Sequence, residues 1–220
     1  MSSAHIDTFA RDNLPPVEQQ PQFMFDLPEL QFPSQLNCAS ALLDQHVTEG
    51  NGSRVCIRAP GLTWTYADLQ AKANRIANVL VHDMGVVPGN RVLLHAPNNA
   101  MMVACWFAVM KVGAIAVATM PLLRAKELKA VVDKAQIRHA LCDAHLDAEL
   151  KLAAQQCTVL QCVRYFNGES PDSADSVEAA MACHSAEFTN ADTASDDTCI
   201  IAFTSGTTGI PKATMHFHRD

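Results

Sequence analysis

The sequence predicts an α/β fold in which a mostly parallel sheet is flanked by helices. Between residues 91 and 165, short apolar runs of strand length alternate with longer segments that carry apolar residues at helical spacing. Successive strand, helix and strand segments form parallel units, which place helices on both faces of the sheet. With 220 residues, of which 49% are hydrophobic and 18% charged, the chain can bury about 70% of its unfolded surface.

The first 35 residues lack this alternation. They contain the scattered aromatic residues Phe23, Phe25 and Phe32 and the prolines Pro15, Pro16, Pro21, Pro28 and Pro33. Because proline interrupts a helix, we expect an extended N-terminal arm whose aromatic side chains dock on the body. The sequence therefore divides into an arm at residues 1–35 and a domain at residues 36–220.

The domain is expected to begin with a short helix and a hairpin. The helix is predicted at Ala39–His46, before the turn signal around Gly50. Two strand candidates at 55–58 and 62–65 are separated by Pro60-Gly61. This arrangement is typical of a β-hairpin.

A second helix is predicted directly after the hairpin. Thr65 stands three residues before Asp68, as in a capping box, and apolar residues then recur at helical spacing. The pattern predicts a helix at about 66–83 that is closed by Gly85.

The parallel units are expected to follow from residue 91. A strand at 91–94 precedes Asn98 and Asn99, either of which can cap the next helix. Two later units end in strands predicted at 138–142 and 159–165.

The segment Ala100–Met120 is apolar enough to suggest a membrane span. Its one charge, Lys111, lies shortly before Gly113, and a lysine in the last turn followed by glycine is a helix stop. A lysine near the centre of a span would cost about 2.5 to 3.5 kcal/mol. We predict a buried helix at 99–111, a buried strand at 114–118 and no membrane span.

Charge and polarity indicate which parts of the chain face solvent. Lys129 with Asp133 and Asp147 with Lys151 form pairs expected on solvated helix faces. Residues 167–197 contain acidic residues but no Lys or Arg, and predict an exposed connector with a short helix near Val177–Cys183. The net charge is −7 and no basic cluster is present, which argues against a nucleic-acid partner.

The cysteines and the N-terminus favour a cytoplasmic protein. None of the eight cysteines forms a Cys-x-x-Cys pair, and most stand in apolar runs, as reduced core thiols do. The N-terminus has neither a basic region nor an apolar stretch of a secretory signal.

Two histidine patterns raise the question of a metal site. In His139-x-x-Cys142-x-x-His145, the first two side chains point to opposite faces of a strand. His216 and His218 would share a strand face, but no third ligand is apparent beside them. We therefore predict no metal site among these residues.

A run of hydroxyls, glycines and one cation near the C-terminus predicts a phosphate-binding loop. Its members are Thr204, Ser205, Gly206, Thr207, Thr208, Gly209, Ile210, Pro211 and Lys212. The glycines allow close approach of a charged ligand to the backbone, and successive N–H groups can converge on an anion. The hydroxyls donate hydrogen bonds, and the ammonium of Lys212 can neutralise part of a polyphosphate. A ligand-free hairpin loop is the alternative interpretation.

The residues around this phosphate loop differ from those of a Walker A loop. That pattern needs Gly before the lysine and Ser or Thr after it, whereas this chain has Pro211 and Ala213. A buried strand is predicted at 199–203, and the alternation over residues 213–218 predicts a second, half-buried strand. The loop is therefore expected to join two strands, which disfavours a generic nucleoside triphosphatase.

Thr204–Lys212 resembles the signature loop of the AMP-forming adenylating enzymes, which include acyl- and aryl-CoA synthetases. Leu62–Leu69 and Lys111–Leu122 resemble two further segments of that family. The family commonly has Gly after the lysine. The Ala213 found here resembles the benzoate- and 2-aminobenzoate-CoA ligase branch.

This resemblance implies ATP-dependent activation of a carboxylic acid to an acyl-adenylate and then to an acyl-CoA. The acid is expected to be aromatic and similar to benzoate or 2-aminobenzoate, and ATP, Mg²⁺ and coenzyme A are the implied cofactors and substrates. The residues implied to bind the nucleotide are Thr204, Ser205, Gly206, Thr207, Thr208, Gly209 and Lys212.

The same resemblance leaves the catalytic residues unassigned. In family members, the adenine and ribose contacts, the acidic Mg²⁺ ligand and the adenylation lysine follow the region that Asp220 closes here. The sequence thus predicts part of the N-terminal adenylation domain of a longer enzyme. The alternative is a truncated, catalytically incompetent fragment that binds nucleotide.

Overall fold

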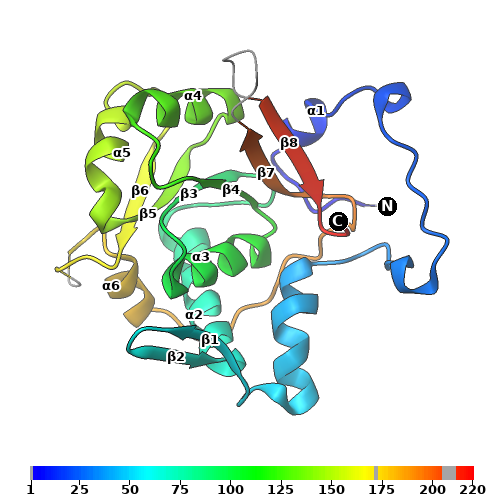
Figure 1. The fold of residues 1–220 in the computed structure, drawn as a ribbon, viewed down its shortest axis with the longest axis horizontal. Helices are drawn as coiled ribbons and strands as arrows, with labels where there is room; N and C mark the ends of the chain where they lie inside the picture. The colour runs from blue at the N-terminus through cyan, green and yellow to red at the C-terminus, as the bar shows by residue number, and fades with distance from the viewer. Residues whose placement is uncertain (1, 171–172, 205–211) are drawn as a thin grey trace.

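The computed structural model describes residues 2–170, 173–204 and 212–220. Its main sheet has six strands in the order β6-β5-β3-β4-β7-β8 (Figure 1). Neighbouring strands run parallel except β8, which is antiparallel to β7. The strands are β3 (Arg91–His95), β4 (Ile115–Thr119), β5 (His139–Asp143), β6 (Cys162–Phe166), β7 (Thr198–Thr204) and β8 (Lys212–Phe217). The predicted α/β class with a mostly parallel sheet is confirmed.

Helices cover both faces of this sheet (Figure 1). One layer consists of α2 (Tyr66–Asn78), α3 (Ala100–Lys111) and α6 (Val177–Ala182), and the other of α4 (Ala125–Ala135) and α5 (Asp147–Ala154). Successive residues of a strand point to opposite faces. Accordingly, Leu94 of β3 packs in the core beneath the first layer, and Leu93 packs in the core beneath the second.

The predicted hairpin and capping box are both present. Strands β1 (Val55–Ala59) and β2 (Leu62–Thr65) pair antiparallel around Gly61, whose φ of 71° is a conformation that favours glycine. The Thr65 hydroxyl accepts from the Asp68 N–H at 3.2 Å, and the Asp68 carboxylate accepts from the Thr65 N–H at 2.9 Å. These bonds satisfy two donors at the start of α2.

The apolar segment 100–120 forms a helix and a strand, as predicted. The Asn99 side chain caps α3 by accepting from the Met102 N–H at 2.9 Å. The chain then turns at Gly113, whose φ is 74°, and enters β4. A side chain at this glycine would lie 2.9 Å from Cβ of Ala191, so the turn also needs the small residue for space. Within the described residues, no helix has the length and apolar character needed to cross a membrane.

The first helical segment and β6 differ most from their predicted ranges. The first helical segment extends over residues 38–51 because the π-helical turns η3 (Ser40–Asp44) and η4 (Val47–Asn51) continue it. The helix predicted at about 66–83 is confirmed, since the π-turn η5 (Val79–Asp83) continues α2 to that end. Strand β6 begins only at Cys162, where the chain first pairs with His139 at the edge of the sheet.

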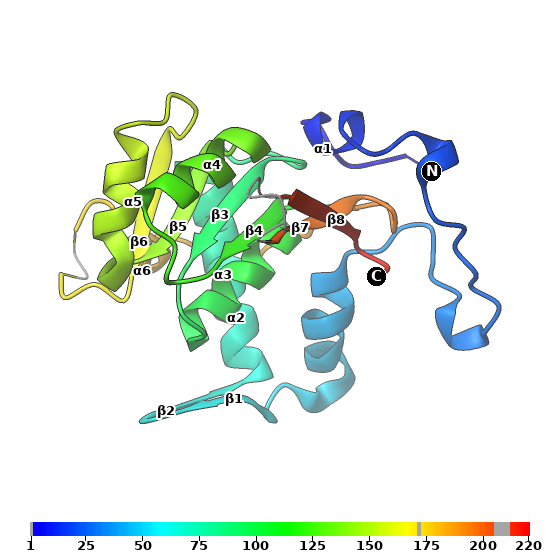
Figure 2. The same ribbon diagram turned by 45° about the horizontal axis from the view of Figure 1, so that its top comes forward.

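The N-terminal segment is mostly non-helical and follows the β8 side of the sheet (Figure 2). It contains α1 (Phe9–Asp12) and the 3-10 turns η1 (Val17–Gln19) and η2 (Pro28–Leu30). Phe23 packs edge-on against Phe217, and the guanidinium of Arg219 lies over the rings of Phe23 and Phe25 at 4.7 and 5.6 Å. The aromatic side chains thus contact the body, and the division at residue 35 stays a prediction.

The acidic connector is less exposed than its composition suggests. Its short helix α6 forms where predicted, but Thr193, Ser195 and Asp197 are buried. The connector crosses the ends of α2 and α3, whose side chains and carbonyls bond its backbone; Asn74, for example, donates to the Ala186 carbonyl at 2.8 Å. These long-range bonds are not encoded in local composition.

Lys111 has a role beyond ending α3. Its side chain is 1% exposed, and its ammonium contacts both carboxylate oxygens of Asp44 at 2.5 and 2.6 Å. Asn190 also donates to that carboxylate, at 2.6 Å. Burial lowers the pKa of Lys111, and the neighbouring carboxylate of Asp44 opposes this effect. The ion pair therefore joins the first helical segment to α3 and to the connector.

We expect Asp44→Asn to destabilise the fold by about 3 kcal/mol, because removal of one partner leaves the buried ammonium without its counter-charge. The free energy of unfolding in urea measures this loss. Asp133→Asn is the control, since Asp133 pairs with Lys129 on an exposed helix face, and a much smaller change is expected there. Equal losses in the two variants would contradict the structural importance of the Lys111 pair.

Candidate functional site

The two ends of the phosphate loop are held together by β-sheet pairing. Thr204 ends β7 and Lys212 begins β8, and the two residues face each other in the antiparallel register. Both are exposed. The strand-to-strand connection is thus confirmed. Of the predicted nucleotide-binding residues, Ser205, Gly206, Thr207, Thr208 and Gly209 lie outside the described residues.

Strand β8 shows the predicted alternation. Lys212, Thr214 and His216 are exposed, whereas the apolar residues between them are half-buried against the sheet. The Thr214 hydroxyl donates to the Ala202 carbonyl of β7 at 3.2 Å. This pairing gives Lys212 a fixed position at the mouth of the loop.

The loop leaves β7 at the edge where the parallel strands end. Strands β3, β4, β5 and β6 run in the same direction as β7, so their carboxyl ends lie at the same edge of the sheet. In open α/β sheets, ligands bind outside this edge, at the point where the strand order reverses. The reversal lies between β3 and β4 here, because the chain passes from β3 to β4 on one side and then to β5 on the other.

Polar side chains end the two strands at that reversal. Nδ1 of His95, the last residue of β3, is 2.9 Å from the hydroxyl of Thr119, the last residue of β4. Both side chains are buried, and Nε2 of His95 has no hydrogen-bond partner among the described residues. Burial lowers the pKa of His95, which favours the neutral ring.

The end of β5 carries a carboxylate at the centre of a hydrogen-bond network. Asp143 accepts from the side-chain amides of Asn99 and Asn167, each at 2.9 Å, and its other oxygen lies 2.7 Å from Nδ1 of His145. Burial opposes ionisation of Asp143, but the bonds from Asn167 and His145 outweigh it and lower the pKa. The network fixes the loops that follow β3, β5 and β6.

A cleft of about 270 Å³ opens beside these groups, with His95, Leu122, Arg124, His145 and Glu149 in its lining. Arg124 is paired with Glu149 at 2.8 Å. The sequence patterns do not single out His95, Thr119 or Asp143. The patterns predict that these residues lie near the ends of strands, but they do not predict the strand order that brings them together.

The base of the β7–β8 hairpin is fixed by Asp197, directly before β7. Its buried carboxylate accepts from the Ala4 N–H at 2.9 Å, from the Ala194 N–H at 3.0 Å and from the Ser3 hydroxyl. Its backbone carbonyl accepts from the His218 N–H at 3.2 Å. Asp197 therefore ties the N-terminal segment to both strands that carry the loop.

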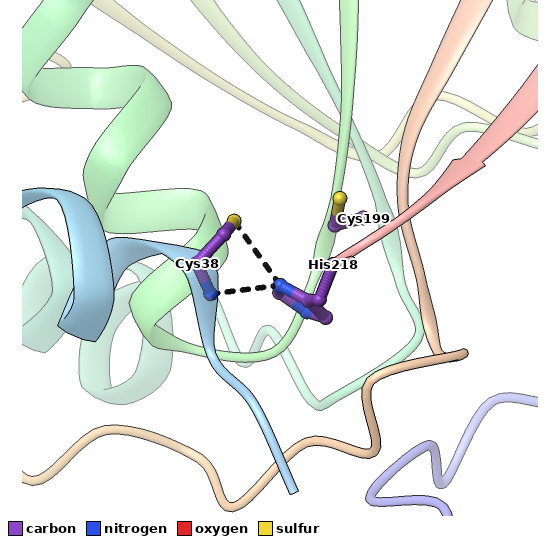
Figure 3. Close-up of side chains that lie close together, drawn as sticks. All are labelled: Cys38, Cys199 and His218. Carbon is purple, nitrogen blue, oxygen red and sulfur yellow. Dashed lines mark hydrogen bonds between the residues drawn. The ribbon is translucent and has the colours of Figure 1, made fainter. Parts of the chain in front are cut away.

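His216 and His218 do not share a strand face as predicted. His218 lies past the end of β8 and is buried, whereas His216 is exposed on the strand. The structure brings His218 to Cys38 and Cys199 (Figure 3). The neighbouring Cys199 thiol lowers the pKa of Cys38, against the effect of burial. The same interaction, together with burial, raises the pKa of Cys199.

The other histidine pattern does not form such a group in the described part of the chain. His139 and Cys142 are both buried on β5, while the ring of His145 is exposed and bonded to Asp143. Only Cys38, Cys199 and His218 bring three candidate ligand atoms close together within the described ranges.

The chain is similar in sequence to a known family and to several curated proteins. Residues 43–220 match the family model described as AMP-binding enzyme. The benzoate–CoA ligase of Thauera aromatica is 26% identical over 88% of this chain and 36% of its own length. A long-chain-fatty-acid–CoA ligase of Mycobacterium tuberculosis is 32% identical over 70% of this chain and 29% of its own. The chain spans about a third of the length of the curated relatives it matches.

Solved structures share the fold. The anthranilate CoA ligase AuaEII in complex with anthranoyl-AMP superposes with a TM-score of 0.81 at 21% identity, over 88% of this chain and 37% of that structure. ATP-bound MatB from Rhodopseudomonas palustris superposes with a TM-score of 0.69 at 27% identity, over 83% of this chain and 35% of its own.

The buried ring of His95 is expected to make the free energy of unfolding depend on pH. Because its folded pKa lies below that of the unfolded chain, the unfolded state takes up a proton first as the pH falls below about 6.5. The stability contributed by the neutral ring is complete above that pH and is lost below it, at up to about 1.4 kcal/mol per pH unit. Burial lowers the pKa of His5 and His139 as well, so they add to the slope.

Urea unfolding at a series of pH values between about 7.5 and 5.5 measures this slope. The variant His95→Gln should show a shallower decline, because the glutamine at this position does not titrate. An unchanged slope in the variant would show that His95 is not responsible.

Proposed function

The chain belongs to the AMP-binding enzyme family, and from this premise we propose that it takes part in ATP-dependent activation of a carboxylic acid. The acid attacks the α-phosphate of ATP, pyrophosphate leaves, and the acyl-adenylate passes its acyl group to the thiol of coenzyme A. The relatives that carry the CoA ligase names are longer than this chain. The proposal therefore concerns the enzyme to which these residues contribute.

The observation that carries the proposal is the position of the phosphate loop. Its two ends, Thr204 and Lys212, are paired in register at the carboxyl edge of the parallel sheet. This edge is where α/β sheets bind ligands. Lys212 is exposed at the mouth of the loop, so its ammonium is available to a polyphosphate.

In this proposal the loop holds the β- and γ-phosphates, which form the leaving group. Backbone N–H groups and the hydroxyls of Thr204, Ser205, Thr207 and Thr208 stabilise the developing charge, together with the ammonium of Lys212. Gly206 and Gly209 allow the phosphates close to the backbone. Mg²⁺ bound to the phosphates would supply further charge neutralisation.

An aromatic acid is the proposed substrate class. Support comes from the benzoate–CoA ligase and from the 3-hydroxybenzoate–CoA/4-hydroxybenzoate–CoA ligase of Thauera aromatica, which is 28% identical over 87% of this chain. Ala213, in place of the glycine common in the family, points to the same branch. The eight free cysteines support a reducing compartment such as the cytoplasm.

A nucleotide-binding chain without catalysis is the second candidate. The observation that favours it is the share of the relatives that the chain spans, which is 36% for the benzoate–CoA ligase. The two candidates share nucleotide binding and differ in acid-dependent chemistry.

We expect the 220-residue chain to bind ATP and pyrophosphate, and Lys212→Ala to weaken binding by about 10-fold, as loss of a charge-assisted contact does. Titration calorimetry measures both affinities. Lys126→Ala, which removes an exposed lysine on α4, is the control and should leave them unchanged. Equal weakening in both variants would indicate only a general charge effect.

We also expect acid-dependent exchange of labelled pyrophosphate into ATP by the enzyme that contains this chain, faster with benzoate or 2-aminobenzoate than with a long-chain fatty acid. The reversal of adenylation produces this signal only when acid, ATP and enzyme are together. Exchange with the fatty acid alone would refute the aromatic class, and ATP binding without any exchange would favour the second candidate.

A further inference from the structure

Three potential metal ligands from distant parts of the sequence meet below the β7–β8 hairpin (Figure 3). Cys38 begins the first helical segment, Cys199 lies in β7, and His218 follows β8. The three residues are 9%, 2% and 5% exposed, respectively. We call this group the Cys38–Cys199–His218 cluster.

The spacing of the cluster suits a tetrahedral metal ion. Its three ligand atoms all lie within 4.8 Å of one another, and Nδ1 of His218 is 3.1 Å from Sγ of Cys38. In zinc sites the metal lies about 2.3 Å from sulfur and about 2.0 to 2.1 Å from nitrogen, so the ligand atoms of one site are about 3.5 to 3.8 Å apart. Adjustments of less than about 1 Å would bring the cluster to that geometry.

A fourth soft donor lies beside Cys38. Sδ of Met110, near the end of α3, is 3.0 Å from Sγ of Cys38, and its side chain is fully buried. Two thiols, an imidazole and a thioether form a donor set that favours soft cations over Mg²⁺ or Ca²⁺.

The imidazole of His218 is oriented toward Cys38. Nδ1 accepts a hydrogen bond from the Cys38 N–H at 3.1 Å and lies 3.1 Å from Sγ of the same residue, so a metal ion bound at Nδ1 would replace the bond from the backbone. Nε2 is buried and has no partner in the part of the chain that the structure describes. Nδ1 is thus the ring nitrogen that the fold directs at the cluster, where it faces the Cys38 thiol.

We propose that Cys38, Cys199 and His218 bind one soft divalent cation of the zinc type, with Met110 within reach as a fourth donor. Binding releases the two thiol protons to solvent and forms two metal–sulfur bonds and one metal–nitrogen bond. Two thiolates and a divalent cation give a site without net charge, which can be buried. Both cysteines are free in the structure, so both thiols are available to the ion.

The proposed ion would fasten the base of the β7–β8 hairpin, at the end opposite the phosphate loop. It would join the first helical segment to β7 and to the turn after β8, the two ends of the hairpin that presents residues 204 and 212. Because a metal that binds only the folded chain stabilises it, this site would raise stability in proportion to metal occupancy.

Cobalt titration of the 220-residue chain, in metal-free buffer with a phosphine reductant, tests the proposal. We expect one equivalent of Co²⁺ to give a thiolate-to-cobalt charge-transfer band and the intense visible bands of a tetrahedral site, and Zn²⁺ to remove them. Cys38→Ala and Cys199→Ala should abolish the bands. Cys105→Ala removes another fully buried thiol outside the cluster and should keep them.

A second measurement covers variants that fold poorly. In the unsubstituted chain, Zn²⁺ should slow alkylation of Cys38 and Cys199 at least 10-fold, as mapped by mass spectrometry, and leave the exposed Cys183 unaffected. Absence of the cobalt bands, bands that persist in Cys199→Ala, or equal alkylation with and without Zn²⁺ would overturn the proposal. So would a reductant-reversible loss of both thiols in the absence of metal, since this would identify a disulfide pair.

Discussion

The common direction of five neighbouring strands is the constraint on which the candidate site depends. Strands β6, β5, β3, β4 and β7 run parallel, so all of their carboxyl ends meet at one edge. Each crossover returns the chain to the opposite edge through a helix, and this fills both faces with apolar layers. The polar ends of β3, β4 and β5 and the start of the phosphate loop therefore lie at one edge, although His95 and Thr204 are 109 positions apart in the sequence.

The antiparallel strand β8 completes this edge by bringing the chain directly back. A crossover helix after β7 would have carried Lys212 away from the strand end, as in a Walker A loop, where a helix follows the phosphates. The register Thr204↔Lys212 instead closes the loop at its base. The acidic chain, with a net charge of −7, can then receive a polyanion because the cation and the backbone N–H groups act locally.

The N-terminal segment helps to hold this hairpin in place. Asp197 bonds the segment at Ser3 and Ala4, and Arg219 lies over Phe23 and Phe25. The Cys38–Cys199–His218 cluster lies at the same end of the hairpin, where Cys38 begins the first helical segment. Residues between 3 and 38 thus contact the two strands that carry the loop. These contacts join residues that are far apart in the sequence, so local sequence patterns do not predict them.

The amino-acid sequence by itself determined the α/β class, the capping box at Thr65, the helix stop near Lys111 and the two strands around the phosphate loop. Local physics sets these features: apolar spacing, capping side chains and the conformational freedom of glycine act over a few residues. Only the tertiary structure decided that Lys111 pairs with Asp44, that Thr119 bonds His95, and that His218 meets two thiols rather than His216. Strand order, register and the path of the connector bring these groups together, and such pairings depend on the packing of the whole chain.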